Sequence, residues 1–279
     1  INQLHGKQLS YNNYNDIFSA LLISKSLPKN IGTVIVKHAN PCGISINKNK
    51  IKSYKLALAC DPKSAFGGIV CCNFKINKKL ALELKKVFLE VVICKSIEKS
   101  ALKILKNRKN LRIIDSSKLD NINLNSIISY FDNFLIQTSD ILNLSKYNFK
   151  VVSKNKPNAR TLKSLIFAFN ICRFVKSNAI VISNYDSTIG IGSGQPSRLE
   201  SCEIAINKMK KFYKKKFDDQ IIAASDAFFP FVDGFEKLVQ AGVSAIIQPS
   251  GSIRDKEIIN FANKTNTILV FSKTRHFRH

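Results

Sequence analysis

The chain has 279 residues, of which 45% are hydrophobic and 23% charged, as in an ordinary globular protein. A chain of this length buries a core large enough to fold without disulfide or metal staples. It contains no run of 18 or more apolar residues, so we expect no membrane span and no membrane partner.

The net charge of +25 is typical of nucleic-acid-binding proteins, because Lys and Arg neutralise phosphates. The lysines are scattered, however, and the one dense run, KMKKFYKKKF (208–217), is expected to form a solvated helix face. Binding of nucleic acid is therefore an alternative that the sequence does not favour, and we expect no nucleic-acid partner.

The seven cysteines include no C-x-x-C pair, which favours a reducing compartment and a cytoplasmic location. No charged-then-apolar leader opens the chain. The first residue is Ile rather than Met, so we expect the chain to be a piece of a longer protein.

Short apolar runs alternate with amphipathic stretches, which predicts an α/β fold. In the first half we expect a strand at 33–37, a tight loop at 38–43, a helix at 50–60, a strand at 69–76, a helix at 78–90, a short strand at 91–93, a helix near 98–107 and a strand at 111–115. In the second half we expect a helix at 161–176, strands at 178–183 and 188–192, a helix at 197–213, a helix near 235–242, a strand at 244–249, a helix at 255–264 and a strand at 267–272. Residues 116–160 lack clear periodicity. The sequence therefore predicts two lobes, 1–118 and 161–279, joined by a connection at 119–160, and two lobes favour a site between them.

The loop KHANPCG (37–43) places Lys37 and His38 at the end of a strand. A histidine titrates near neutral pH and can act as a general base, although an isolated loop histidine is as often a surface residue. A catalytic zinc needs three protein ligands, and this loop offers only His38 and Cys42, because Ser45 stands where a second cysteine would be required. We therefore expect no metal.

Four further loops carry polar or aromatic groups. TIGIGSGQPSR (188–198) and QPSGSIRD (248–255) precede helices, where free amides can bind an anion. SDAFFPF (225–231) combines an acidic residue with three phenylalanines that form either a ligand wall or core packing. TRHFRH (274–279) is a basic ending that is either a disordered tail or a segment held in place.

These loops, together with QLHGKQLSYNN (3–13), DPKSAFGGIV (61–70) and VKSNAIV (175–181), resemble the aminoimidazole carboxamide ribonucleotide (AICAR) formyltransferase family. The resemblance implies two cytidine-deaminase-like three-layer α/β lobes without zinc. It also implies transfer of the formyl group of 10-formyltetrahydrofolate to the 5-amino group of AICAR, as a step of purine biosynthesis. A zinc deaminase-like hydrolase is the alternative that such a fold leaves open.

By the same resemblance His38 is the general base, Lys37 stabilises the charge that develops during transfer, and Asn178 positions the nucleotide and the formyl group. Gly67, Glu90 and Arg275 would line the nucleotide pocket. The folate side would be lined by Arg198, Leu199, Phe228, Asp233, Ser252 and Ile253.

Members of this family form homodimers whose active sites use residues of both subunits, so the resemblance also implies a homodimer. An inosinate cyclohydrolase domain usually precedes this unit, and we expect that domain, with its cyclohydrolase activity, upstream of Ile1.

Overall fold

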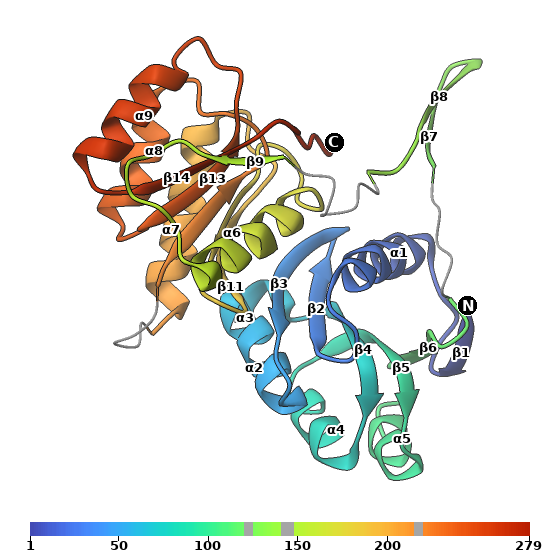
Figure 1. Ribbon diagram of the computed structural model, residues 1–279. Helices are drawn as coiled ribbons and strands as arrows, with labels where there is room; N and C mark the ends of the chain where they lie inside the picture. Colours follow the sequence, from blue (N-terminus) through green and yellow to red (C-terminus); the bar gives the residue numbers. More distant parts are fainter. Residues whose placement is uncertain (120–124, 141–147, 215–219) are drawn as a thin grey trace.

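The computed structural model describes residues 1–119, 125–140, 148–214 and 220–279. Their main features are two six-stranded mixed sheets, each covered by helices, so the predicted α/β class is confirmed (Figure 1). The first sheet has the spatial order β1 (Asn2–His5), β6 (Arg112–Asp115), β5 (Leu89–Ile97), β4 (Gly68–Ile76), β2 (Gly32–Lys37) and β3 (Asn40–Ile46). The second has the order β11 (Thr188–Gly192), β10 (Ile180–Ser183), β12 (Ile222–Ser225), β13 (Ala245–Pro249), β14 (Ile268–Ser272) and β9 (Phe149–Val151).

The two lobes are built on one plan. The helices of the first are α1 (Tyr11–Ser26), α2 (Lys50–Cys60), α3 (Pro62–Ala65), α4 (Lys78–Leu84) and α5 (Lys99–Lys106). Those of the second are α6 (Ala159–Cys172), α7 (Arg198–Phe212), α8 (Val232–Gln240) and α9 (Asp255–Lys264). Except for the short α3, the order α1-β2-β3-α2-β4-α4-β5-α5-β6 matches α6-β10-β11-α7-β12-α8-β13-α9-β14, and the strand order in the sheets matches as well. The chain is therefore a structural duplication.

Helices on both faces of the sheets give three layers and three cores. One core lies under α1 and α6 and is shared by the two lobes, with Ile17 and Phe169 among its members. The opposite face of each sheet has a core of its own, around Phe74 in the first lobe and Phe235 in the second. Full burial of side chains of this size contributes about 1.5–3 kcal/mol each, so the shared core binds the lobes to one another.

The lobes meet edge to edge along β3 and β11. Ser45 and Ser187 form an antiparallel bridge, and Thr188 Oγ1 accepts the N–H of Ile44 at 2.9 Å. Across the same seam Lys208 pairs with the buried carboxylate of Asp61 at 2.9 Å. Lys208 begins the lysine-rich run at 208–217, so this part of the run is not simply a solvated face, and residues 215–217 lie outside the described residues.

The loop between β2 and β3 is shorter than predicted. The tight loop expected at 38–43 has only two residues outside strands, since β3 already begins at Asn40. Pro41 is tolerated in the strand because the pairing register with β2 shifts next to it. Gly43 is required because a Cβ there would overlap the carbonyl oxygen of Ala57 in α2.

Other differences lie at helix ends and in the predicted connection. Helix α1 was not predicted, and the helix expected at 78–90 ends at Leu84 because β5 begins at Leu89. Within 119–160, of which 120–124 and 141–147 lie outside the described residues, β9 joins the second sheet. The strands β7 (Ser126–Tyr130) and β8 (Asn133–Gln137) form a hairpin that extends away from both lobes (Figure 1).

Candidate active site

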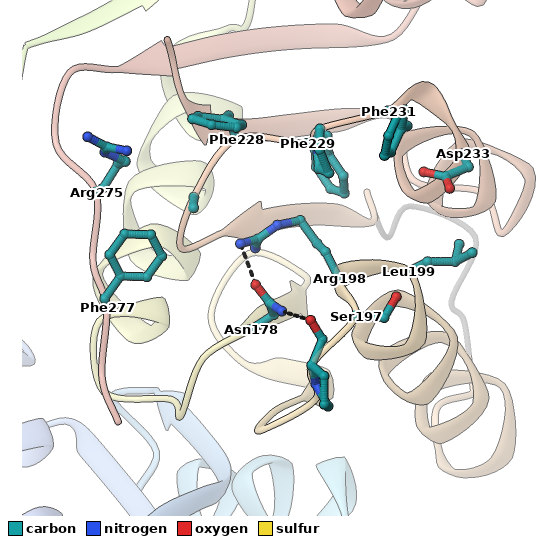
Figure 2. A pocket seen from close by; sticks show the side chains of 13 residues that line it. Asn178, Ser197, Arg198, Leu199, Phe228, Phe229, Phe231, Asp233, Arg275 and Phe277 are labelled. Carbon is teal, nitrogen blue, oxygen red and sulfur yellow. Dashed lines mark hydrogen bonds between the residues drawn. The ribbon is translucent and has the colours of Figure 1, made fainter. Parts of the chain in front are cut away.

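A pocket of about 460 Å³ opens in the second lobe where β11 leads into α7 and β12 ends. Figure 2 shows its lining, which comes from four stretches of chain. The lining residues are Asn178, Pro196, Ser197, Arg198, Leu199, Ala227, Phe228, Phe229, Pro230, Phe231, Asp233, Arg275 and Phe277. Six of the twelve residues predicted from the sequence are thus brought together here: Asn178, Arg198, Leu199, Phe228, Asp233 and Arg275.

Arg198 begins helix α7, which is capped by Ser197, and its guanidinium turns inward. Nη1 donates to Asp226 Oδ1 at 2.5 Å and to Ser225 Oγ at 2.7 Å, while Nη2 donates to Asn178 Oδ1 at 2.7 Å. The side chain of Asp226 is fully buried, and that of Arg198 is 9% exposed. The charge of Arg198 is therefore neutralised inside the protein, on the floor of the pocket.

Both polar atoms of the Asn178 side chain are hydrogen-bonded within the protein. Its Nδ2 donates to the carbonyl oxygens of Gln195 and Pro196, both at 2.8 Å, and its Oδ1 accepts from Arg198. The preceding residue, Ser177, donates its hydroxyl to Asp226 Oδ2 at 2.6 Å. Asp226 thus holds both Arg198 and the backbone next to Asn178. Asp226 belongs to the SDAFFPF motif, but the motif alone does not indicate that Asp226 binds Arg198 and Ser177.

Part of the pocket lining is apolar. Phe228, on the loop after β12, and Leu199, on α7, are partly exposed in it, whereas Phe229 is buried and packs edge-on against Phe235 at a centroid distance of 5.9 Å. Phe231 is half-exposed, and the guanidinium of Arg254 lies over its ring at 4.7 Å. The three phenylalanines of the motif therefore divide between ligand wall and core, which the sequence alone left open.

Asp233 and Arg275 supply charge at the rim. Asp233 is exposed in the first turn of α8, and Arg275 is exposed on the segment that follows β14. No ion pair of Arg275 is formed within the described residues. An unpaired guanidinium at a pocket rim suits a phosphate or carboxylate.

The basic C-terminal segment is held in place. The N–H of His276 donates to the carbonyl of Asp226, and the N–H of Ser177 donates to the carbonyl of Arg278, both at 2.9 Å. Arg278 also reaches the first lobe, where Nη2 donates to Ser19 Oγ at 3.0 Å. The chain ending is therefore part of the site rather than a free tail.

Ser252 and Ile253 lie on the loop beside this pocket and do not line it. Ile253 is fully exposed, and the connection to the pocket runs through its neighbour Arg254. The anion site expected in QPSGSIRD is filled by the chain itself, because Asp255 accepts the N–H groups of Gly251 at 2.8 Å and of Ser252 at 3.3 Å.

The glycine-rich loop also differs from expectation. A Cβ on Gly190 or Gly192 would overlap a backbone carbonyl of α7, from Ala205 or Ser201. These two glycines allow the helix to lie close against β11. Only Gly194, with φ of 70°, belongs to the loop, and its N–H donates to the carbonyl of Lys176 at 2.8 Å.

Lys37 and His38 stand in the first lobe, at the turn between β2 and β3. His38 is exposed, and Lys37 Nζ donates to the carbonyl of Phe66 at 2.8 Å. The turn lies at the seam, because Asn40 donates from Nδ2 to Ser193 Oγ at 2.7 Å and accepts the N–H of Lys176 at 3.2 Å. It therefore contacts the segment that leads to Asn178.

Gly67 and Glu90 belong to the same end of the first sheet. A Cβ on Gly67 would lie 3.8 Å from Lys37 Nζ, so this position borders the lysine closely. Glu90 accepts from Asn13 Nδ2 at 3.0 Å and lies 3.9 Å from Arg112. The structure thus places Gly67 beside Lys37, and the lining of the pocket in the second lobe includes neither of these residues nor Glu90.

No group of three or more His, Cys, Asp or Glu side chains is arranged to hold a metal ion in the part of the chain that the structure describes. Over the same residues, no helix has the length and apolarity needed to cross a bilayer.

Comparison with known proteins gives consistent matches. The bifunctional purine biosynthesis protein PurH of Leptospira biflexa is 42% identical over 280 aligned positions, covering 99% of this chain. The PurH proteins of Caldicellulosiruptor saccharolyticus and Buchnera aphidicola are 43% and 42% identical over 279 positions. Each match covers 53% of the relative, so the chain spans about half the length of the curated relatives it matches. A family model described as AICARFT/IMPCHase bienzyme matches residues 1–208, and the chain therefore belongs to this family.

Proposed function

We propose that the chain is the formyltransferase half of such a bifunctional enzyme of purine biosynthesis. It would transfer the formyl group of 10-formyltetrahydrofolate to the 5-amino group of AICAR, giving the formylated nucleotide and tetrahydrofolate. The observation that carries the proposal is the pocket that gathers Asn178, Arg198, Phe228 and Arg275. The β2–β3 turn that contains His38 is hydrogen-bonded to the segment leading to Asn178, so His38 lies at the neighbouring seam between the lobes. The relatives named above support a purine-biosynthesis enzyme over the alternative of a nucleic-acid-binding protein.

The reaction needs one bond made and one broken. The amine nitrogen attacks the formyl carbon, the bond from that carbon to N10 of the folate then breaks, and N10 takes up a proton. His38 is suited to take the proton from the amine, and the ammonium of Lys37 is suited to stabilise the oxyanion on the formyl oxygen. The amine is a weak nucleophile because its lone pair delocalises into the ring, so placement and proton removal carry the catalysis.

The hydrogen bonds of Asn178 restrict how it can bind a substrate. Both hydrogens of Nδ2 are already donated to carbonyl oxygens, and one lone pair of Oδ1 is used by Arg198. What remains is one lone pair of Oδ1, which can only accept. Asn178 is therefore suited to hold an N–H of the attacking amine and unsuited to donate to the formyl oxygen.

The pocket residues also fit a reduced folate. A volume of about 460 Å³ with the apolar side chains of Leu199 and Phe228 in its lining suits a flat heterocycle. Asp233 at the rim can accept from the amino and N–H groups of a pterin. Arg275, exposed on the other side, suits an anionic part of either substrate.

The test is formyl transfer by purified chain, followed as tetrahydrofolate formation. We expect activity in the wild type and a loss of kcat of at least about a hundredfold in His38→Ala, the scale of a general base. His5→Ala is the matched control, since His5 lies on β1 with its ring against the carbonyl of Arg108. An inactive wild type, or equal effects of the two substitutions, would contradict the proposal.

We also propose a homodimer, and the β7–β8 hairpin supports it. An isolated two-stranded hairpin is marginal in water, and this one carries seven exposed apolar side chains. They are Ile127, Ile128, Tyr130, Phe131, Phe134, Leu135 and Ile136. A second copy of the chain is the occupant that the family resemblance implies. In sedimentation equilibrium the wild type should be a dimer, and Phe134→Asp with Ile136→Asp should shift it toward monomer; an unchanged dimer would exclude the hairpin as the interface.

The duplicated lobes further support a cytidine-deaminase-like fold without zinc, as the resemblance implied. Elemental analysis of the purified chain tests this point, because stoichiometric zinc would favour the hydrolase alternative. The seven cysteines are all free and buried, which supports a reducing, cytoplasmic setting.

A further inference from the structure

We propose that Asp16 is a positioning residue for His38. Its carboxylate holds the two-residue turn between β2 and β3 in the conformation that presents the imidazole at the seam between the lobes. The inference rests on the proposed function, in which His38 removes a proton from the attacking amine.

The turn adopts an unfavourable backbone conformation. His38 has a φ of 55° and Ala39 a φ of 56°, both in the left-handed region that side chains disfavour. This region is sterically disfavoured for residues that carry a side chain, so contacts from outside the turn have to maintain it.

Asp16 supplies two of those contacts. Its Oδ1 accepts the N–H of Ala39 at 2.6 Å, and its Oδ2 accepts the N–H of His38 at 3.2 Å. Hydrogen bonds to an ionised acceptor are stronger than those between neutral groups, so these two contacts can offset the conformational cost of the turn. A carboxylate can accept with both oxygens, whereas an asparagine amide accepts with one.

The carboxylate itself is rigidly held. Asp16 lies on α1, and the start of this helix is fixed by a capping box between Ser10 and Asn13. The residue that follows Asp16, Ile17, is fully buried in the shared core. On the far side of the turn, Asn40 is bonded to the second lobe. His38 is therefore held between a helix of its own lobe and the segment that leads to Asn178.

The test is a double-mutant cycle on formyl transfer by the full chain, using Asp16→Asn, His38→Ala and the pair. Asp16→Asn should lower kcat by about tenfold or more while both KM values stay within about twofold, because the hydrogen bonds that this side chain makes within the described residues go to the turn. In the His38→Ala background the same substitution should change kcat by less than about twofold, since no imidazole remains to be positioned. The control is Asp186→Asn, the same substitution at the corresponding turn of the second lobe, where the carboxylate accepts from Asn47 Nδ2 at 2.9 Å; it should leave kcat within about twofold of wild type.

A wild-type kcat in Asp16→Asn, or an equal loss in both backgrounds, overturns the inference. Adding Ala39→Gly to Asp16→Asn makes the test independent of overall stability, because glycine adopts a positive φ without steric cost. That addition should restore kcat by about threefold or more, and no recovery also overturns the inference. An inactive wild type would instead show that the proposed function is wrong, which separates the two failures.

Discussion

Replacing the buried Asp226 by asparagine should damage both stability and catalysis. The substitution keeps the shape of the side chain but removes the charge that neutralises Arg198. It also replaces one of the two accepting oxygens, which bind Arg198 and the Ser177 hydroxyl, by a donor. Asn178 then loses the ordered partner of its Oδ1.

The size of the effect follows from burial. The side chain of Asp226 has no exposed surface, and 9% of the Arg198 side chain is exposed, so the uncompensated guanidinium cannot recover hydration in place. Breaking a buried pair in this way costs about 3–5 kcal/mol. For a chain of this size each kcal/mol lowers Tm by about 2–4 °C, so a fall of roughly 10 °C is expected.

Thermal unfolding and steady-state kinetics measure the two consequences. We expect the lower Tm together with a loss of kcat of about tenfold or more at temperatures where Asp226→Asn is folded. Asp233→Asn is the control, because this carboxylate is exposed on the same pocket and should change Tm by less than about 2 °C. A Tm of Asp226→Asn equal to that of the control would refute the reasoning.

Three further predictions concern the rest of the structure. Burial opposes ionisation of Asp61, but Lys208 and Ser64 outweigh it and keep the pKa of Asp61 below its usual 3.8. Asp61→Asn should therefore lower the free energy of unfolding, measured with denaturant at pH 7, by about 2–3 kcal/mol. This is less than for a fully buried pair, because Lys208 is partly exposed. The difference in stability between the variant and the wild type should shrink as the pH falls below about 4, where the carboxylate of Asp61 becomes protonated. Gly192→Ala should cost about 1–3 kcal/mol because its Cβ would overlap α7, whereas Gly242→Ala, with open space around it, should cost only about 1 kcal/mol for its positive φ; equal costs would contradict the packing argument. Burial raises the pKa of the thiols of Cys60 and Cys71 to about 12, so a thiol reagent at pH 8 should label the native chain at none of its cysteines and the unfolded chain at all seven.

The strands were predictable where apolar residues run continuously, as at 33–37 and 267–272, because both faces of these sheets are buried. Helix α1 was not, because it faces the shared core with polar residues among its buried ones, including Asn13, Ser19 and Ser24. Their presence interrupts the apolar periodicity from which a helix is recognised.

In the site, the resemblance to the formyltransferase family indicated side chains that line the pocket, such as Phe228 and Arg275, whereas their motifs alone left core packing and a free tail open. It could not indicate the residues that hold these side chains in place. Asp16 and Asp226 act through contacts with residues at least 22 positions away, and such contacts exist only after folding.

The core shared by α1 and α6 has a consequence for how the molecule comes apart. Neither lobe has a complete hydrophobic interior without the other, because one face of each sheet is covered jointly. The duplication therefore does not yield two autonomous folding units, and we expect a single cooperative unfolding transition rather than two. A chain cut within 119–160 should behave as two fragments that fold only when they complement each other.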